Sequence, residues 1–349
     1  MKWLQWAGLP VGIAIFIVLV VHEGARDVIN IIGMAGPMLL WLVPFHLLPL
    51  WLDARGWYYL LGKRQPMTFL VWVASIREAV NRLLPSVGVG GEIVGIRLAR
   101  WRVPDGSFVA ATVIVEVMTT IAVQYVFSAL GLVLIVAATG DSSSMRTIVT
   151  IALALLLTLP LPIITVLLLR RGGVFHAIER FAGRLLGEGR PVVLGIDGNQ
   201  LDRDIDALMS RTGLMLRTFG WQLAGYMVGA FETWWALRLL GHPVSIGGAL
   251  AIEALTQAVR HAAFMVSAGL GIQEAAVVLL AQLFGAGHEV ALSLALVKRM
   301  REVVFGCLAL LSWQVAEVVR TRRLVRSGAA GDSTAMLSSD RSPHREEVH

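Results

Sequence analysis

Apolar runs long enough to cross a membrane recur along most of this 349-residue chain. A helix needs about 20 apolar residues to span the hydrocarbon core of a bilayer. Only 15% of the residues are charged, whereas a soluble domain carries about a quarter. The sequence therefore predicts an all-α polytopic membrane protein with about six full spans. The candidate spans are 7–22, 33–52, 107–139, 147–169, 214–240 and 302–319.

The first apolar run has two readings. Lys2 followed by the stretch from Ala7 to Val21 also resembles the start of a signal peptide. The residues that follow, His22 to Arg26, make a poor cleavage site, and many further spans come later. We therefore favour an uncleaved first span.

The distribution of basic residues predicts the orientation. Arginines concentrate in 170–217 and after residue 319, whereas 23–32 and 140–146 carry one each. Because cytoplasmic loops are enriched in Lys and Arg, we expect both termini to be cytoplasmic. The net charge of +6 is thus explained by topology and contact with anionic lipid headgroups, and nucleic acid is not expected as a partner.

Two moderately apolar segments, 68–99 and 246–285, are interrupted at mid-length by charges and glycines. Such segments are typical of re-entrant helical hairpins, which enter the membrane and return on the same side. We therefore predict two re-entrant hairpins in addition to the full spans.

The sequence also predicts how the chain divides into domains. We expect a membrane domain over 1–323 with a cytoplasmic amphipathic linker at about 170–213, and a disordered cytoplasmic tail over 324–349. In the linker, 174–186 and 201–209 place apolar residues on one helical face. Either stretch fits a helix in the membrane interface or one packed under the protein itself.

The sequence contains an internal repeat. At an offset of 179 residues, Leu60-Leu61-Gly62 falls on Leu239-Leu240-Gly241, and Asp53 falls on Glu232; after a small insertion, Glu92 falls on Glu274. The predicted orientation inverts the two copies, about 33–139 and 214–319. Inverted repeats with broken helices are a recurrent transporter design with a substrate site near the midplane. A purely structural duplication is the alternative.

Ionisable and amide side chains inside apolar surroundings supply the candidate site. Each charge near the bilayer centre costs about 3 kcal/mol or more, so it must be paired or face water. The alternative role is internal ion pairing, for which Glu78 and Arg82 are the best case. The substrate-binding candidates are Arg77, Asn81, Arg82 and Glu92 in the first hairpin, Arg260, His261, Gln273 and Glu274 in the second, and Glu116, Lys298 and Arg299 on flanking spans.

The position of the basic residues near 298 leaves two readings. Residues 289–319 read as one helix about 45 Å long. Lys298 and Arg299 would then lie either in the outer headgroup layer or on a cavity that holds an anion. No catalytic or metal motif accompanies them in the sequence, and Cys307 is the single cysteine. We therefore expect neither an enzyme nor a cofactor.

Two stretches, Arg77 to Glu92 and Gly269 to Ala276, resemble the two signatures of the lysylphosphatidylglycerol synthase transmembrane-region family, also called flippase-like membrane proteins. The second signature departs from the family pattern at Ala268, where glycine is usual. The resemblance extends to about residue 320. One candidate subfamily is the stand-alone branch of the family that is associated with hopanoid synthesis.

The resemblance implies a multi-pass protein of the bacterial inner membrane that moves a lipid or lipid-linked molecule between leaflets. The expected partners are membrane lipids with an anionic or zwitterionic headgroup, and a homodimer stays open. The alternative function is a scaffold or regulator of a lipid-biosynthesis enzyme that transports nothing.

Overall fold

The computed structural model describes residues 36–84, 90–139, 149, 197–262 and 272–339, and these residues form helices and short connections without a strand. The predicted all-α class is confirmed for this part of the chain. The elements are η1 (Pro37–Trp41), α3 (Leu42–Phe45), α4 (Leu47–Leu60), α5 (Met67–Leu83), α6 (Gly90–Ala99), α7 (Gly106–Thr139), α11 (Gly198–Met209), α12 (Thr212–Leu239), α13 (Ile246–Ala262), α14 (Ile272–Leu283) and α15 (His288–Ser339).

Three stretches of the described residues are long and apolar enough to cross a membrane: Pro37–Leu60, Gly106–Ala137 and His288–Arg322. They coincide with three predicted spans. The span predicted at 214–240 is α12, whose 28 residues extend about 42 Å, but it is more polar than these three. The spans predicted at 7–22 and 147–169 lie outside the described residues. The membrane character is confirmed, and the number of spans stays a prediction.

The stretch Pro37–Leu60, which we call the first rod, is continuous but has irregular helix geometry around His46. Pro44 and Pro49 lack the N–H that would bond to the preceding turn. His46 keeps the rod continuous, because its N–H bonds to the carbonyl of Leu42 at 3.1 Å and its carbonyl accepts from Leu50 at 3.4 Å. The sequence suggests a connection over 53–64, but α4 continues to Leu60. Trp57 and Leu60 are buried, which stabilises this longer helix.

The helix boundaries follow the offsets found in the sequence. Helices α5 and α13 begin 179 positions apart. Helices α7 and α15 begin 182 positions apart. The order of helices is therefore repeated along the chain.

We call α4 to α7 the first set of helices and α12 to α15 the second set. The turn that follows the first helix of each set, α4 or α12, has the same geometry in both. Gly62 and Gly241 both adopt a positive φ, 68° and 79°. Lys63 N–H bonds to the carbonyl of Tyr58, and His242 N–H bonds to that of Leu237, again 179 positions apart. This is the usual helix ending at a left-handed glycine.

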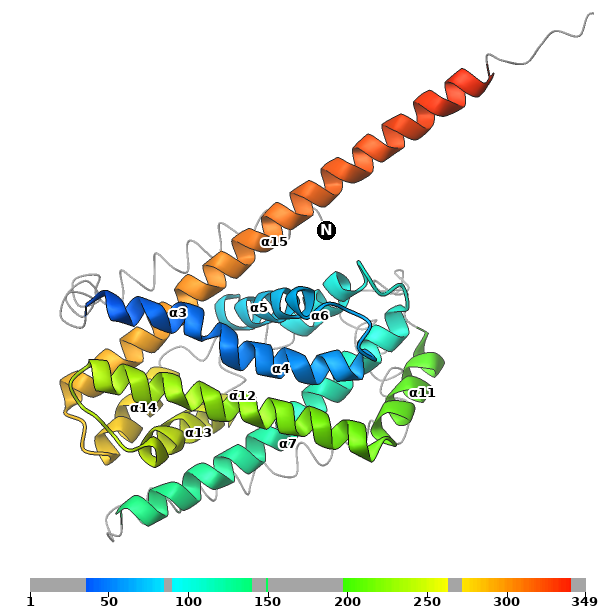
Figure 1. Cartoon of the computed structure of the whole chain (residues 1–349). Coiled ribbons are helices and arrows are strands. Elements are labelled where there is room, and N and C mark those ends of the chain that lie inside the picture. The colour runs from blue at the N-terminus through cyan, green and yellow to red at the C-terminus, as the bar shows by residue number, and fades with distance from the viewer. Residues whose placement is uncertain (1–35, 85–89, 140–148, 150–196, 263–271, 340–349) are drawn as a thin grey trace, which may run out of the picture.

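Helices α4 and α12 pack side by side in opposite directions (Figure 1). A Cβ added to Gly225 would lie 3.0 Å from the carbonyl oxygen of Pro49, and one added to Gly56 would lie 3.2 Å from Thr218. These small residues allow the backbones to approach closely. The turns at Gly62 and Gly241 therefore lie at opposite ends of this pair.

Each long helix packs on the other set. Helix α15 contacts α5, and α7 contacts α13. Gly306 of α15 faces Leu83, and Gly131 of α7 faces Ala254. This exchange joins the two sets into one bundle, from which α15 extends well beyond the other helices (Figure 1).

The described residues form two large apolar cores and a small third cluster at Phe127, Ala230 and Ala254. One contains much of α4, α5 and α6, the start of α7 and α11; the other contains α14, the end of α12 and parts of α13. Helix α15 contributes Ala291 to Val297 to one core and Val303 to Leu310 to the other. Its charged residues lie between these stretches, and His46 likewise lies between Leu42 and Leu50, which belong to different cores.

Helix α11 decides the role of one linker stretch. Leu201, Ile205 and Leu208 are buried, and the helix packs on α7. Asp197 caps its start by accepting a hydrogen bond from the Asn199 N–H at 2.9 Å. This half of the amphipathic linker is thus packed under the protein itself, while 174–186 lies outside the described residues. At the other end of the chain, α15 continues to Ser339, into the segment for which the sequence predicts disorder.

Candidate functional site

Arg77 on α5 lies between two carboxylates, and these residues with Asn81 form what we call the Arg77 site. Its Nη1 donates to Glu116 Oε2 on α7 at 2.7 Å, and its Nη2 donates to Glu92 Oε2 on α6. The guanidinium also lies over the ring of Trp57, 5.1 Å from its centroid. A planar fork can bridge two acids in this way, which a single ammonium cannot do.

The start of α6 is held against α5 by the same residues. Asn81 accepts a hydrogen bond from the Gly91 N–H at 2.8 Å and donates to Glu92 at 3.3 Å. A Cβ on Gly91 would lie 2.3 Å from the carbonyl oxygen of Arg77, and one on Gly95 would lie 2.5 Å from the Arg77 Cδ. Glycine is required at both positions for this close approach.

A second buried ion pair, the Lys298 site, joins α13 and α15. Lys298 Nζ contacts Glu253 Oε2 and donates to Thr233 Oγ1 at 2.8 Å. Glu253 also accepts from Thr233 at 2.6 Å and from Gln257 at 2.9 Å. The carboxylate is therefore fully hydrogen-bonded as well as paired, which is the condition for a stable buried charge.

Between these two sites lies a larger group that we call the central cluster. Arg82 donates to Glu302 at 2.7 Å, and Arg301 donates to Glu232 at 2.7 Å. Helices α4, α5, α12, α14 and α15 meet here through side chains alone. The members are His46, Glu78, Arg82, Glu232, Gln273, Glu274, Arg299, Arg301 and Glu302.

The predicted candidates divide among these groups. The Arg77 site brings together Arg77, Asn81, Glu92 and Glu116. The central cluster contains Arg82, Gln273, Glu274 and Arg299; here Gln273 donates to Glu302 at 3.1 Å, and Glu274 lies 3.7 Å from Arg299. Lys298 pairs separately with Glu253.

Two candidates of the second hairpin are not placed in any of these groups. Arg260 is half-buried near the end of α13. The side chain of His261 lies outside the described residues. The predicted role of both therefore stays a prediction.

The basic residues of α15 are buried. The side chains of Lys298, Arg299 and Arg301 are only 5%, 8% and 6% exposed. They are enclosed by neighbouring helices and paired with carboxylates, while their depth in the membrane stays a prediction.

The sequence interpretation missed His46 altogether and used Glu232 only as a mark of the repeat. Both are ionisable groups within predicted spans, and such groups are functional candidates by default. That signal could have found them, because His46 lies inside the otherwise uncharged run 33–52.

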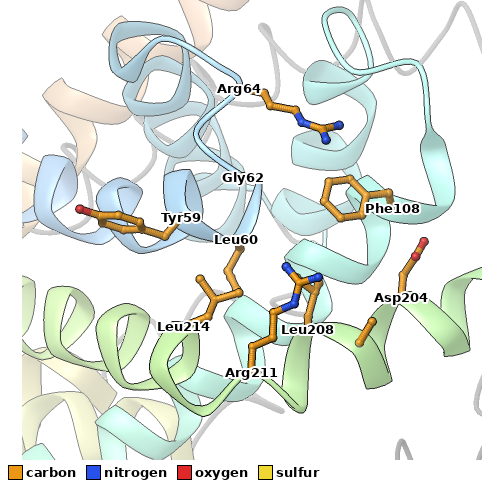
Figure 2. Close-up of a pocket in the computed structure, with 10 residues that line it drawn as sticks. Tyr59, Leu60, Gly62, Arg64, Phe108, Asp204, Leu208, Arg211 and Leu214 are labelled. Carbon is orange, nitrogen blue, oxygen red and sulfur yellow. The ribbon is translucent and has the colours of Figure 1, made fainter.

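A small pocket of about 260 Å³ lies between the turn after α4, the start of α7 and the junction of α11 with α12. Arg64 and Arg211 approach it from opposite sides, and Phe108 and Leu60 line its wall (Figure 2). Partial burial and the neighbouring Asp105 raise the pKa of Asp204, which also lines the pocket. Two guanidinium groups beside apolar walls can bind an anion.

Comparison with protein families gives a match over residues 5–309 to the lysylphosphatidylglycerol synthase transmembrane region. The chain belongs to this family. The match includes all of the buried charged groups described above. No curated protein and no solved structure matches the chain.

Membership of the lysylphosphatidylglycerol synthase transmembrane-region family agrees with the apolar helices and indicates a membrane protein with a lipid-related function. The predicted resemblance is thereby confirmed. The buried charges therefore lie within a membrane domain, where an unpaired charge is costly.

Proposed function

We propose that this protein moves a lipid or lipid-linked molecule between the leaflets of the bacterial inner membrane. The observation that carries the proposal is the position of the charged groups. They lie between two apolar cores, where helices from both repeated sets meet. A lipid headgroup that crosses the hydrocarbon needs such a polar place at mid-depth.

The helix pairs α5–α6 and α13–α14 supply the broken elements of this proposal. The described parts of α6 and α14 contain 10 and 12 residues, and at 1.5 Å per residue neither stretch reaches across a bilayer of about 30 Å. We assign both pairs as re-entrant hairpins. With the opposite directions of α4 and α12, this arrangement supports an inverted repeat; the proposal that both termini are cytoplasmic rests on the distribution of Lys and Arg in the sequence.

Substrate binding would require an exchange of ionic partners. Arg82, Arg299 and Arg301 each contact more than one carboxylate. A phosphate or carboxylate on the substrate can replace one of these partners and leave the other in place, so no guanidinium is left unpaired at any step. Arg77 with its two acids offers the same exchange on the α6 side.

The test is leaflet exchange in liposomes that contain the purified protein. A broad panel of lipids with labelled anionic and zwitterionic headgroups is offered, with and without a proton gradient. Exchange of at least one lipid should be faster than in empty liposomes, and Arg260→Ala or Glu274→Ala should slow it. Arg203→Ala is the matched control, because Arg203 is exposed on α11 and donates to the backbone carbonyl of Asn199 within its own helix.

The second candidate is a scaffold or regulator of a lipid-synthesis enzyme. It is favoured by the fact that every candidate Arg and Lys of the three charged groups is already paired with Glu in the structure. If no lipid of the panel exchanges faster than in empty liposomes, the transport proposal fails and this candidate replaces it.

A further inference from the structure

His46 lies between carboxylates from two different helices. Its Nε2 is 2.8 Å from Glu78 Oε2 on α5, and its Nδ1 is 3.4 Å from Glu232 Oε2 on α12. The first contact is a hydrogen bond, and the second is an ion-pair distance. The ring of Phe305 packs edge-on against the imidazole, with centroids 4.9 Å apart. His46 thus connects the first rod to both α5 and α12.

The two contacts indicate which protonation state the ring holds. A neutral imidazole carries one N–H, so the lone pair of its other nitrogen would face an ionised carboxylate. The imidazolium carries an N–H on both nitrogens and presents one to each acid. With Glu78 on one side and Glu232 on the other, only the protonated ring is complementary to its surroundings.

The charges around His46 are mixed. From α12 and α15, Glu232 and Arg301 are joined at 2.7 Å; from α5, Glu78 and Arg82 are joined at 3.4 Å. The two carboxylates favour a positive charge on the ring and the guanidinium of Arg301 opposes it. On its own rod the acid is Asp53. The central cluster as a whole contains four carboxylates, Glu78, Glu232, Glu274 and Glu302, and three guanidiniums, Arg82, Arg299 and Arg301.

One further positive charge makes this cluster neutral. An unbalanced charge enclosed in a medium of low dielectric constant is costly, so the surroundings favour the state that removes it. A proton on His46 removes it without any movement of the helices.

We infer that His46 is a proton-binding site that joins the two halves of the bundle, with the imidazolium holding Glu78 and Glu232 together. When the proton leaves, it passes from Nε2 to Glu78 Oε2, whose side chain is 17% exposed, and from there to water. The cluster then changes from neutral to a charge of −1, and the contact with Glu232 loses its attraction. That this release drives the exchange between leaflets rests on the proposed transport function.

The protonation state is measured on the wild-type protein in lipid bilayers by nitrogen-15 NMR of labelled histidine, which separates imidazolium from imidazole. His46 is assigned from the signal lost in His46→Gln. Should that variant not fold, each of the other seven of the eight histidines is replaced in turn, and the signal that survives every replacement is His46.

At about pH 7.5, His46 should have a ratio of imidazolium to imidazole at least about tenfold higher than His288. His288 is the matched control, because it is exposed and its Nδ1 contacts the amide of Gln282 instead of an acid. A His46 ring that is neutral at this pH, or that titrates together with His288, would overturn the inference.

Coupling is tested separately in the liposomes. Wild-type exchange should change with pH over the range in which His46 titrates, and folded His46→Gln should lose this pH dependence. If His46→Gln keeps the wild-type pH profile, the coupling is wrong. If wild-type liposomes show no exchange at all, the proposed function fails, while the NMR result still decides the proton-binding site.

Discussion

The Arg77 site and the Lys298 site occupy equivalent places in the two repeated sets of helices. Glu116 on α7 and Lys298 on α15 are 182 positions apart, the same offset that separates the starts of these helices. Each pairs with the first helix of its hairpin, Glu116 with Arg77 on α5 and Lys298 with Glu253 on α13. The repeat therefore keeps the two helices that an ion pair joins and reverses its sign, although by the offset of 179 Arg77 corresponds to Thr256 and Glu253 to Ala74.

The two sites differ in how completely they are closed. At the Lys298 site one ammonium meets one carboxylate, which also accepts hydrogen bonds from Thr233 and Gln257. At the Arg77 site one guanidinium meets two carboxylates, and the Glu92 side chain is 22% exposed. From this difference we propose that the Lys298 site holds helices together and that the Arg77 site contacts the substrate.

The largest predicted effect tests whether the two sets of helices have opposite orientations in the membrane. Arg64 and Pro243 are exposed in the turns after α4 and α12 and are 179 positions apart. Single cysteines there, in a Cys307→Ala background, should react with a membrane-impermeant reagent from opposite sides, Arg64→Cys from the cytoplasm. Labelling of both from one side would break the equivalence of the two sites.

Next in size is the loss of Lys298. Lys298→Ala leaves Glu253 buried without a cation, which should lower the free energy of unfolding by about 3–5 kcal/mol. Folded yield and melting temperature in detergent report it. Lys298→Met combined with Glu253→Gln should recover part of the loss, and the exposed Arg203→Ala should change stability by less than about 0.5 kcal/mol. If Lys298→Ala has the folded yield and melting temperature of the wild type, the pair of Lys298 and Glu253 does not stabilise the packing of these helices.

A smaller effect is expected at the glycines found only in the first set. Gly91→Ala places its Cβ 2.3 Å from the Arg77 carbonyl oxygen, which should cost about 1–3 kcal/mol. Gly220→Ala on α12, with no neighbouring atom within 4 Å, is the control and should not destabilise the protein. Melting temperatures of both variants check the difference; equal values would show that α6 does not approach α5 this closely.

These comparisons show what the sequence could predict. The offset of 179 found from a few matched residues agrees with the starts of α5 and α13, since a repeated pattern of apolar residues and glycines is local information. Gln257 and Glu253 are four residues apart, a spacing that places two side chains on one helix face, and they are hydrogen-bonded at 2.9 Å. Composition and run length were likewise enough for the membrane class.

The partners across helices could not be predicted. The same spacing favoured a pair between Glu78 and Arg82, which lie 3.4 Å apart. Arg82 nevertheless has a shorter contact, 2.7 Å, with Glu302 on α15. Which helices pack together depends on the exchange of α7 and α15 between the two sets, and no local pattern contains that information.

The most direct test of the account compares Arg77→Lys with wild type in the leaflet-exchange assay, at matched amounts of folded protein. Lysine keeps the positive charge but cannot bridge Glu92 and Glu116 as the planar fork does. We expect the variant to fold and to exchange lipid at least about tenfold more slowly, a change of about 1.4 kcal/mol in the barrier. Exchange at the wild-type rate, or a loss that only follows a loss of folded protein, would contradict a substrate-contacting role for the Arg77 site.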